Sequence, residues 1–172
     1  MPSNEKYSFV KILKSVLVNG LILVSVYFAV QAYQTRNVVV GAAPELSGVL
    51  LDGQYFSGLG ELKKPVIVHF WATWCKVCEF EQAAISRISH DYSVVSIASS
   101  SVSHHDVKQF VSDNGIDFLV INDASNRIAL DWGVAAFPTS FIVDEDGKIR
   151  FVEVGLTTEM GLRFRLWLTK FI

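Results

Sequence analysis

Two cysteines, Cys75 and Cys78, are the only cysteines of the chain and lie in the segment HFWATWCKVCEFE. Their C-x-x-C spacing allows a metal site, a structural disulfide or a reactive redox pair. Structural zinc needs four ligands, and the chain offers these two cysteines and four scattered histidines. A disulfide across so short a loop restricts the unfolded chain little and therefore contributes little stability. Redox chemistry explains more of the pattern.

The residues around the cysteines support this interpretation. The segment PVIVHFWA, residues 65–72, is rich in β-branched residues and predicts a buried central strand. The stretch after it has helical spacing, so Cys75 should lie at a helix N-terminus, where the helix dipole and free N–H groups lower the pKa of a thiol. Lys76 adds a positive charge beside it. Cys78, one turn into the helix, is placed to attack a mixed disulfide formed at Cys75. The helical spacing is that of Phe80, Ala84, Ile85 and Ile88.

The rest of the chain alternates strands and helices. A hairpin is predicted over residues 46–56, with its turn at Asp52-Gly53. The pattern predicts an α/β fold whose sheet is parallel in its first part and closed by an antiparallel hairpin. The further strands are predicted at 93–99, 117–123, 137–143 and 149–155, and the further helices at 103–115, 125–134 and 157–172.

An uncharged apolar stretch precedes this domain. Residues 15–35 would form about 31 Å of helix, close to the hydrocarbon thickness of a bilayer. Lysines lie before the stretch and only Arg36 follows closely, so the N-terminus, 1–14, is predicted to be cytoplasmic. The alternative is a cleavable signal peptide ending near Ala32. The predicted organisation continues with a linker, 36–45, and one domain, 46–172. The net charge of −2 gives no general attraction to nucleic acid.

Two segments together resemble the thioredoxin superfamily. VIVHFWATWCKVC is similar to its W-C-x-x-C motif, and WGVAAFPTSFIVDEDGKI is similar to its second motif, which centres on a Pro-Thr pair. The resemblance covers about 46–172 and implies a thioredoxin-like fold: a central mixed sheet flanked by helices, with an N-terminal hairpin. The fold is preceded by one predicted transmembrane helix.

The resemblance also implies roles for individual residues. Cys75 would be the nucleophile and Cys78 the resolving thiol. Pro138 would be a cis-proline facing the pair, so that the backbone of Phe137 can bind an extended substrate, with Trp74 supplying apolar surface. The redox-active disulfide replaces any cofactor, and no metal is expected.

Within the superfamily, the chain is most similar to the anchored TlpA/ResA/DsbE-like branch, and particularly to the suppressor-of-copper-sensitivity D type (ScsD). Glu81 matches a glutamate of that branch and could exchange a proton with the buried thiol, or it could be an exposed surface residue. Ala83 replaces the usual proline. His69 stands where thioredoxins carry a buried aspartate, so it could relay a proton, stabilise a thiolate, or be a hydrogen-bonded core residue.

The sequence therefore predicts a single-pass inner-membrane thiol–disulfide oxidoreductase with its catalytic domain in the periplasm. Its expected partners are envelope proteins with thiols or disulfides, a membrane or periplasmic thiol donor or acceptor, and the bilayer through 15–35. Reduction or exchange of disulfides is the expected activity. The direction stays open, because it depends on the reduction potential of the pair, which Lys76 and Glu81 would shift in opposite senses, and on the partner that recycles it. A Cu(I) carrier using the cysteines and a histidine is the alternative, and a peroxidase has less support. His104 and His105 are left unassigned.

Overall fold

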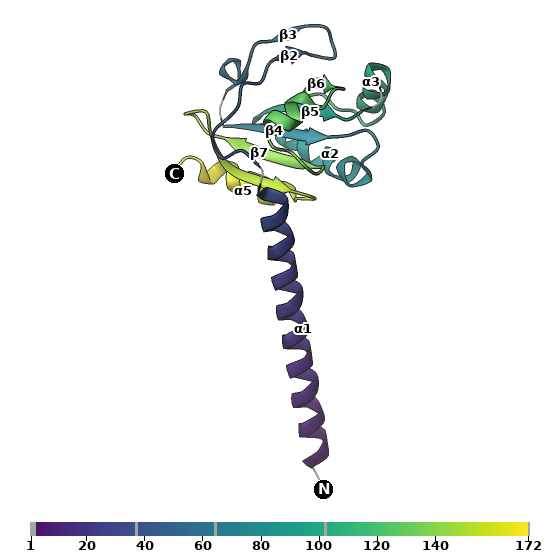
Figure 1. Cartoon of the computed structure of the whole chain (residues 1–172), viewed down its shortest axis with the longest axis vertical. Helices are drawn as coiled ribbons and strands as arrows, with labels where there is room; N and C mark the ends of the chain where they lie inside the picture. The colour runs from purple at the N-terminus through teal and green to yellow at the C-terminus, as the bar shows by residue number, and fades with distance from the viewer. Residues whose placement is uncertain (1–2, 37, 64, 102, 172) are drawn as a thin grey trace. The chain divides into compact units, whose positions relative to one another are not determined.

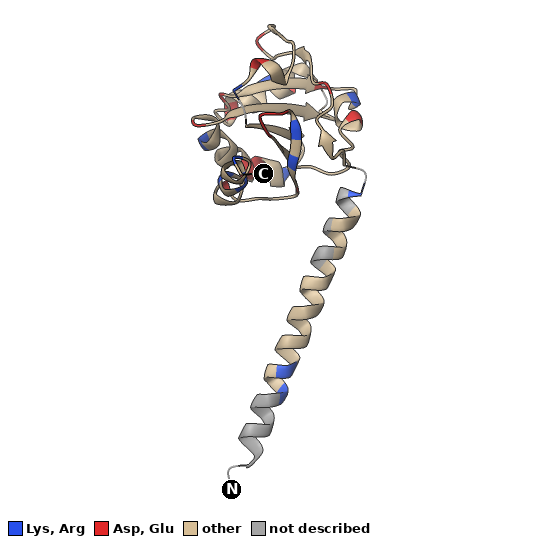
Figure 2. Cartoon of the chain, turned by 90° about the vertical axis from the view of Figure 1, so that its left-hand side faces the viewer, with Lys and Arg blue, Asp and Glu red and all other residues tan. Residues whose placement is uncertain are grey.

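The computed structural model describes residues 3–36, 38–63, 65–101 and 103–171, and the chain forms two units, 1–36 and 37–172 (Figure 1). The first unit is one helix, α1 (Ser3–Thr35). Its described basic residues, Lys11 and Lys14, lie in its N-terminal half, and Arg36 follows its last residue (Figure 2). Within the described part of the chain, no helix combines the length and apolar character that crossing a bilayer requires. The anchor over 15–35 is not confirmed and stays a prediction.

The second unit is built on a six-stranded mixed sheet (Figure 1). Its strands, in spatial order, are β1 (Gly41–Ala42), β8 (Lys148–Val154), β7 (Thr139–Val143), β4 (Val66–Trp71), β5 (Ser93–Ser99) and β6 (Leu119–Asp123). Strands β4, β5 and β6 run parallel. Strand β7 pairs antiparallel with both β4 and β8, and β1 pairs antiparallel with β8. The predicted mixed sheet with a closing antiparallel hairpin is confirmed.

The N-terminal hairpin is also present. It consists of β2 (Gly48–Val49) and β3 (Tyr55–Phe56), followed by a 3-10 turn, η1 (Leu59–Glu61). Residues assigned from the sequence to a linker contribute more than expected, since β1 extends the main sheet and Val38 is buried in the core. A two-residue strand is too short to show the alternation that identifies a strand.

Side chains of β4 alternate between the two faces of the sheet, as the pleat requires. On one face Phe70 packs against Trp132 and Phe141, with ring centroids 5.6 Å from each. On the other face Ile67 packs against side chains of two helices that cover the sheet there. The helices of this unit are α2 (Lys76–Ser89), α3 (His104–Asp113), α4 (Arg127–Asp131) and α5 (Glu159–Leu168). Helices α2 and α5 cover the Ile67 face.

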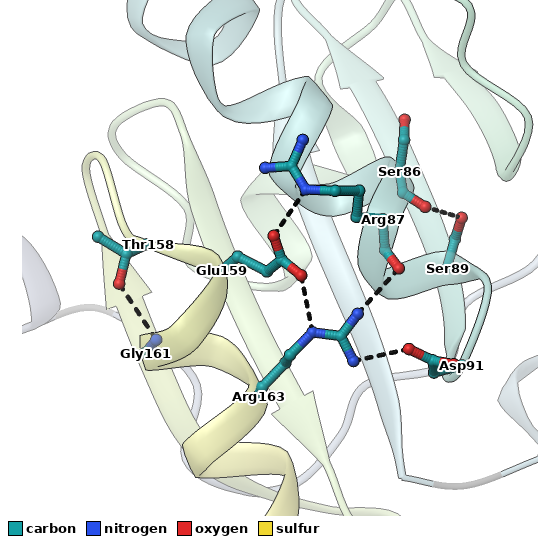
Figure 3. Close-up of polar contacts among 8 residues, drawn as sticks. All are labelled: Ser86, Arg87, Ser89, Asp91, Thr158, Glu159, Gly161 and Arg163. Atoms are coloured by element: carbon teal, nitrogen blue, oxygen red, sulfur yellow. Dashed lines mark hydrogen bonds and ion pairs between the residues drawn. The ribbon is translucent and has the colours of Figure 1, made fainter.

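Ion pairs hold α2 against α5 (Figure 3). Arg163 of α5 donates to Asp91 at 2.7 Å and to the backbone oxygen of Arg87 at 3.0 Å. The Glu159 carboxylate pairs with both arginines. Its Oε2 lies 2.6 Å from Arg87 Nε, and its Oε1 lies 2.8 Å from Arg163 Nε. The helix that begins at the cysteine pair is therefore fixed at its far end by the last helix of the chain.

The helix predicted after Cys75 is confirmed as α2, and the structure shows which of its faces is buried. Its buried residues are Cys78, Glu81, Gln82, Ile85 and Ile88. Phe80, one of the residues whose spacing indicated the helix, is 80% exposed. The helix turns by about 100° per residue, and the face that includes Cys78, Ile85 and Ile88 passes through Glu81 rather than Phe80.

Candidate redox site

The two cysteines form a disulfide where β4 leads into α2. Cys75 is the N-cap of the helix, and its Sγ accepts the backbone N–H of Cys78 at 3.2 Å. Cys75 is 8% exposed and Cys78 is fully buried. The N–H groups at a helix start favour a negative sulfur. Cys75 is thus the more exposed of the two cysteines, and its sulfur lies where the helix start favours a negative charge.

The predicted second motif lies beside this pair. The Phe137–Pro138 peptide bond is cis, as the resemblance implied, and Phe137 packs against the cluster that contains both cysteines. The Trp74 ring meets Phe137 edge-on, with centroids 5.9 Å apart. Trp74 is 61% exposed, and its indole N–H donates to the backbone oxygen of Ser100 at 3.0 Å. The structure therefore brings together Cys75, Trp74 and Phe137 at one apolar surface.

Glu81 lies one turn after Cys78 on the buried face of α2, not on the surface. It is 1% exposed, and its Oε1 accepts the backbone N–H of Thr157 at 3.2 Å. Burial raises the pKa of Glu81 to about 7, the Thr157 hydrogen bond opposes this rise, and the negative charge of Glu153 adds to it. A carboxyl group with such a pKa can both donate and accept a proton near neutral pH.

Glu153 and Arg165 were not identified from the sequence. Arg165 Nε lies 2.5 Å from Glu153 Oε1, joining β8 to α5. Burial raises the pKa of Glu153, and the charge and hydrogen bond of Arg165 oppose that rise. Glu153 is the register partner of Ser140, which in turn is opposite His69. The only available sequence signal was an acidic residue inside the apolar run IRFVEV.

His69 is completely buried on β4. Its Nδ1 lies 2.9 Å from Ser140 Oγ, and among the described residues its Nε2 has no hydrogen-bond partner. Burial lowers the pKa of His69 to about 3, so the imidazole is neutral at physiological pH. The geometry is that of the core-histidine alternative, and a charged imidazolium is not available to stabilise a thiolate.

Lys76 and the histidine pair lie at the surface. The Lys76 side chain is 85% exposed and pairs with Glu79 at 3.0 Å, so solvent and a counter-charge screen it. His104 and His105 begin α3, whose N-cap is Ser103. In the described part of the chain, no three His, Cys, Asp or Glu side chains are placed to hold a metal ion.

Comparisons with known proteins agree with this geometry. The AhpC/TSA family model matches residues 39–152. A thioredoxin-like protein of Haemophilus influenzae is 32% identical over 165 residues, covering 92% of this chain and 98% of its own. The thiol-disulfide oxidoreductase ResA of Bacillus anthracis is 31% identical over 151 residues, covering 85% of this chain and 87% of its own.

A solved structure shows the same fold. The thiol:disulfide interchange protein of Chlorobium tepidum, from the thioredoxin family, superimposes with a TM-score of 0.66 and is 27% identical. The match covers 76% of this chain and 97% of that one. It therefore extends over almost the whole of that protein.

Proposed function

Because the chain belongs to the AhpC/TSA family and is a thioredoxin-like disulfide oxidoreductase of the C-x-x-C type, we propose that Cys75 is its nucleophile and Cys78 its resolving thiol. The observation that carries this assignment is their unequal exposure at the start of α2, since partners can reach only the outer sulfur. The Cys78 N–H, 3.2 Å from the Cys75 sulfur, would stabilise the Cys75 thiolate.

The reaction proceeds in two exchanges. The Cys75 thiolate attacks a substrate disulfide, forms a mixed disulfide and expels one substrate thiolate. The Cys78 thiolate then attacks Cys75 Sγ, which releases the second substrate thiol and leaves the Cys75–Cys78 disulfide. The substrate gains two electrons and the chain loses two. Pro138 and Phe137 hold the substrate backbone, and Trp74 shields the reacting sulfurs from water.

Glu81 is proposed as the proton acceptor for Cys78. The second exchange needs the Cys78 thiol to lose its proton in a site that water does not reach. Glu81 lies one turn further along the same buried helix face, with a pKa raised by burial to about 7. Its carboxylate can take this proton and return it when the pair is reduced again. We assign His69 a structural role in the core. The charge of Lys76 has only a minor effect on the Cys75 thiolate.

We further propose that the catalytic domain works outside the cytoplasm and reduces or exchanges disulfides of envelope proteins. A thiol donor in the membrane or periplasm would reset it. The uncharged stretch 15–35 behind the Lys11 and Lys14 charges supports an inner-membrane anchor with a cytoplasmic N-terminus. The match to a ResA protein over most of both chains supports membership of the TlpA/ResA/DsbE-like branch. Closeness to the ScsD type is part of the proposal.

The test combines a reduction potential with the trapping of partners. Cys78→Ser should accumulate mixed disulfides between Cys75 and envelope proteins, and Cys75→Ser should accumulate none. A potential near that of cytosolic thioredoxin, about −270 mV, indicates a reductase, and one near about −120 mV indicates an oxidase. Stoichiometric Cu(I) retained through gel filtration without trapped partners would favour the metal carrier, and turnover of hydrogen peroxide would favour a peroxidase.

A further inference from the structure

The solvent side of α2 next to Cys75 is apolar. Val77 is 44% exposed and Phe80 is 80% exposed, and Ala83 and Ala84 follow on the same side of the helix. Residues three and four positions apart are neighbours on a helix surface, so these side chains are contiguous. We refer to these four residues as the α2 strip.

The strip begins close to the nucleophile in the helix. Phe80 lies five residues after Cys75, which corresponds to about 7.5 Å along the helix axis and about 140° around it. Side chains on a helix lean towards its N-terminus, so the ring of Phe80 leans back over the turn that contains Val77. Trp74, immediately before Cys75 in the chain, is also exposed.

The charges beside the strip cancel. Lys76 and Glu79 lie on the first turn and pair with each other at 3.0 Å. These two charges therefore cancel on the first turn of α2, while Phe80 offers a large apolar contact to whatever covers it.

We propose that the α2 strip docks an apolar side chain that the substrate carries within about three residues of its reactive cysteine. The inference rests on the proposed function and adds a substrate class to it. The occupant is the substrate itself, because its sulfur must reach Cys75 and Cys75 is the N-cap of the helix that carries the strip. An extended chain advances about 3.3 Å per residue, so two or three residues span the distance to Phe80.

The test uses two peptides, each coupled through its single cysteine to 5-thio-2-nitrobenzoate as a mixed disulfide. One peptide has Leu at the third position on each side of the cysteine, and the other has Ser there. The full chain is first reduced with dithiothreitol and freed of it. Attack by Cys75 releases thionitrobenzoate, which is followed by its absorbance, and Cys78 then expels the peptide thiol. The measured quantity is the ratio of the two second-order rate constants.

The wild-type chain should react about tenfold faster with the Leu peptide than with the Ser peptide, since burying Leu against Phe80 favours the transition state. Phe80→Ser should reduce this ratio to about one or two. Phe164→Ser, which changes an exposed phenylalanine of α5, is the matched control and should keep the tenfold ratio.

Two results would overturn the inference: equal wild-type rates for the two peptides, or an unchanged ratio in Phe80→Ser. A small disulfide, cystamine, separates these outcomes from failure of the proposed function. If the reduced wild-type chain reacts with neither cystamine nor either peptide, the proposed function fails and the inference fails with it. If cystamine reacts and the peptide ratio is one, only the inference fails.

Discussion

Glu81 accepts a hydrogen bond from the backbone N–H of Thr157, 3.2 Å from Oε1, and so joins the helix of the cysteine pair to the segment before α5. Glu153 lies close enough to raise the pKa of Glu81 further, and Arg165 pairs with Glu153. The proposed proton acceptor therefore belongs to a set of charged groups drawn from α2, β8 and α5, and its titration should respond to each of them.

Glu81→Gln should remove the inflection near pH 7 from the pH dependence of the rate at which Cys78 resolves the mixed disulfide. With a pKa of about 7, Glu81 loses its proton across neutral pH and then both accepts the Cys78 proton and opposes a charge on that sulfur. The rate of mixed-disulfide resolution should show this inflection in wild type between about pH 5 and 9, and Glu81→Gln should lack it. Glu79→Gln, which removes an exposed carboxylate of the same helix, is the control. An inflection retained in Glu81→Gln contradicts the assignment.

Glu153→Gln should move the same inflection to lower pH. The change removes the negative charge that raises the pKa of Glu81. The pKa of Glu81 should therefore fall, and the profile should shift by about half to one pH unit. An upward shift, or none, would show that the two carboxylates are not coupled in solution.

His69 should reduce the stability of the fold in acid. Its pKa is lowered to about 3 in the folded chain against about 6.5 when exposed, so protons bind the unfolded chain first. The contribution of neutral His69 to the free energy of unfolding is complete above pH 6.5 and is lost as the pH falls towards 3. About 2 kcal/mol of this contribution is lost between pH 7 and pH 5.

Urea unfolding of wild type and His69→Gln at these two pH values measures this loss. The variant should lose about 2 kcal/mol less than wild type on acidification, whatever its absolute stability. His104→Gln, at the start of α3, should behave as wild type. Parallel losses in wild type and His69→Gln would mean that the imidazole is not buried in neutral form.

Arg163→Gln should weaken the packing of α2 against α5. The variant loses the ion pairs with Asp91 and Glu159, which are partly exposed, so the expected loss is about 1 kcal/mol at low salt. Salt screens such pairs, and the difference from wild type should shrink in about 1 M NaCl. Urea unfolding at both salt concentrations tests this, with Arg127→Gln on α4 as the control. A loss that does not depend on salt would indicate packing rather than charge.

Local patterns predicted much of the fold. The β-branched run before Cys75 forms β4, and the Asp52-Gly53 turn lies in the hairpin of β2 and β3. The mixed sheet has the predicted arrangement of strands. These features depend on neighbouring residues, which one sequence displays directly. Strand β1 was missed because its two residues gain their structure from pairing with β8, a partner more than a hundred positions away.

Long-range partners also limited the prediction of the site. The cysteine pair, Trp74 and the Phe137–Pro138 segment could be named from two motifs. The burial of Glu81 depends on the segment at Thr157 and on α5, and the partner of His69 comes from β7. Phe80 was placed with the apolar residues of α2 because spacing alone does not tell which helix face the sheet covers.

The complete burial of Cys78 constrains the order in which partners meet the enzyme. On the proposed assignment, electrons enter and leave the pair through one sulfur, that of Cys75. A partner that reduces the chain and a partner that oxidises it would therefore occupy the same surface in turn, and each would exclude the other. Turnover should follow ping-pong kinetics, with each partner acting as a competitive inhibitor of the other when it is present in excess.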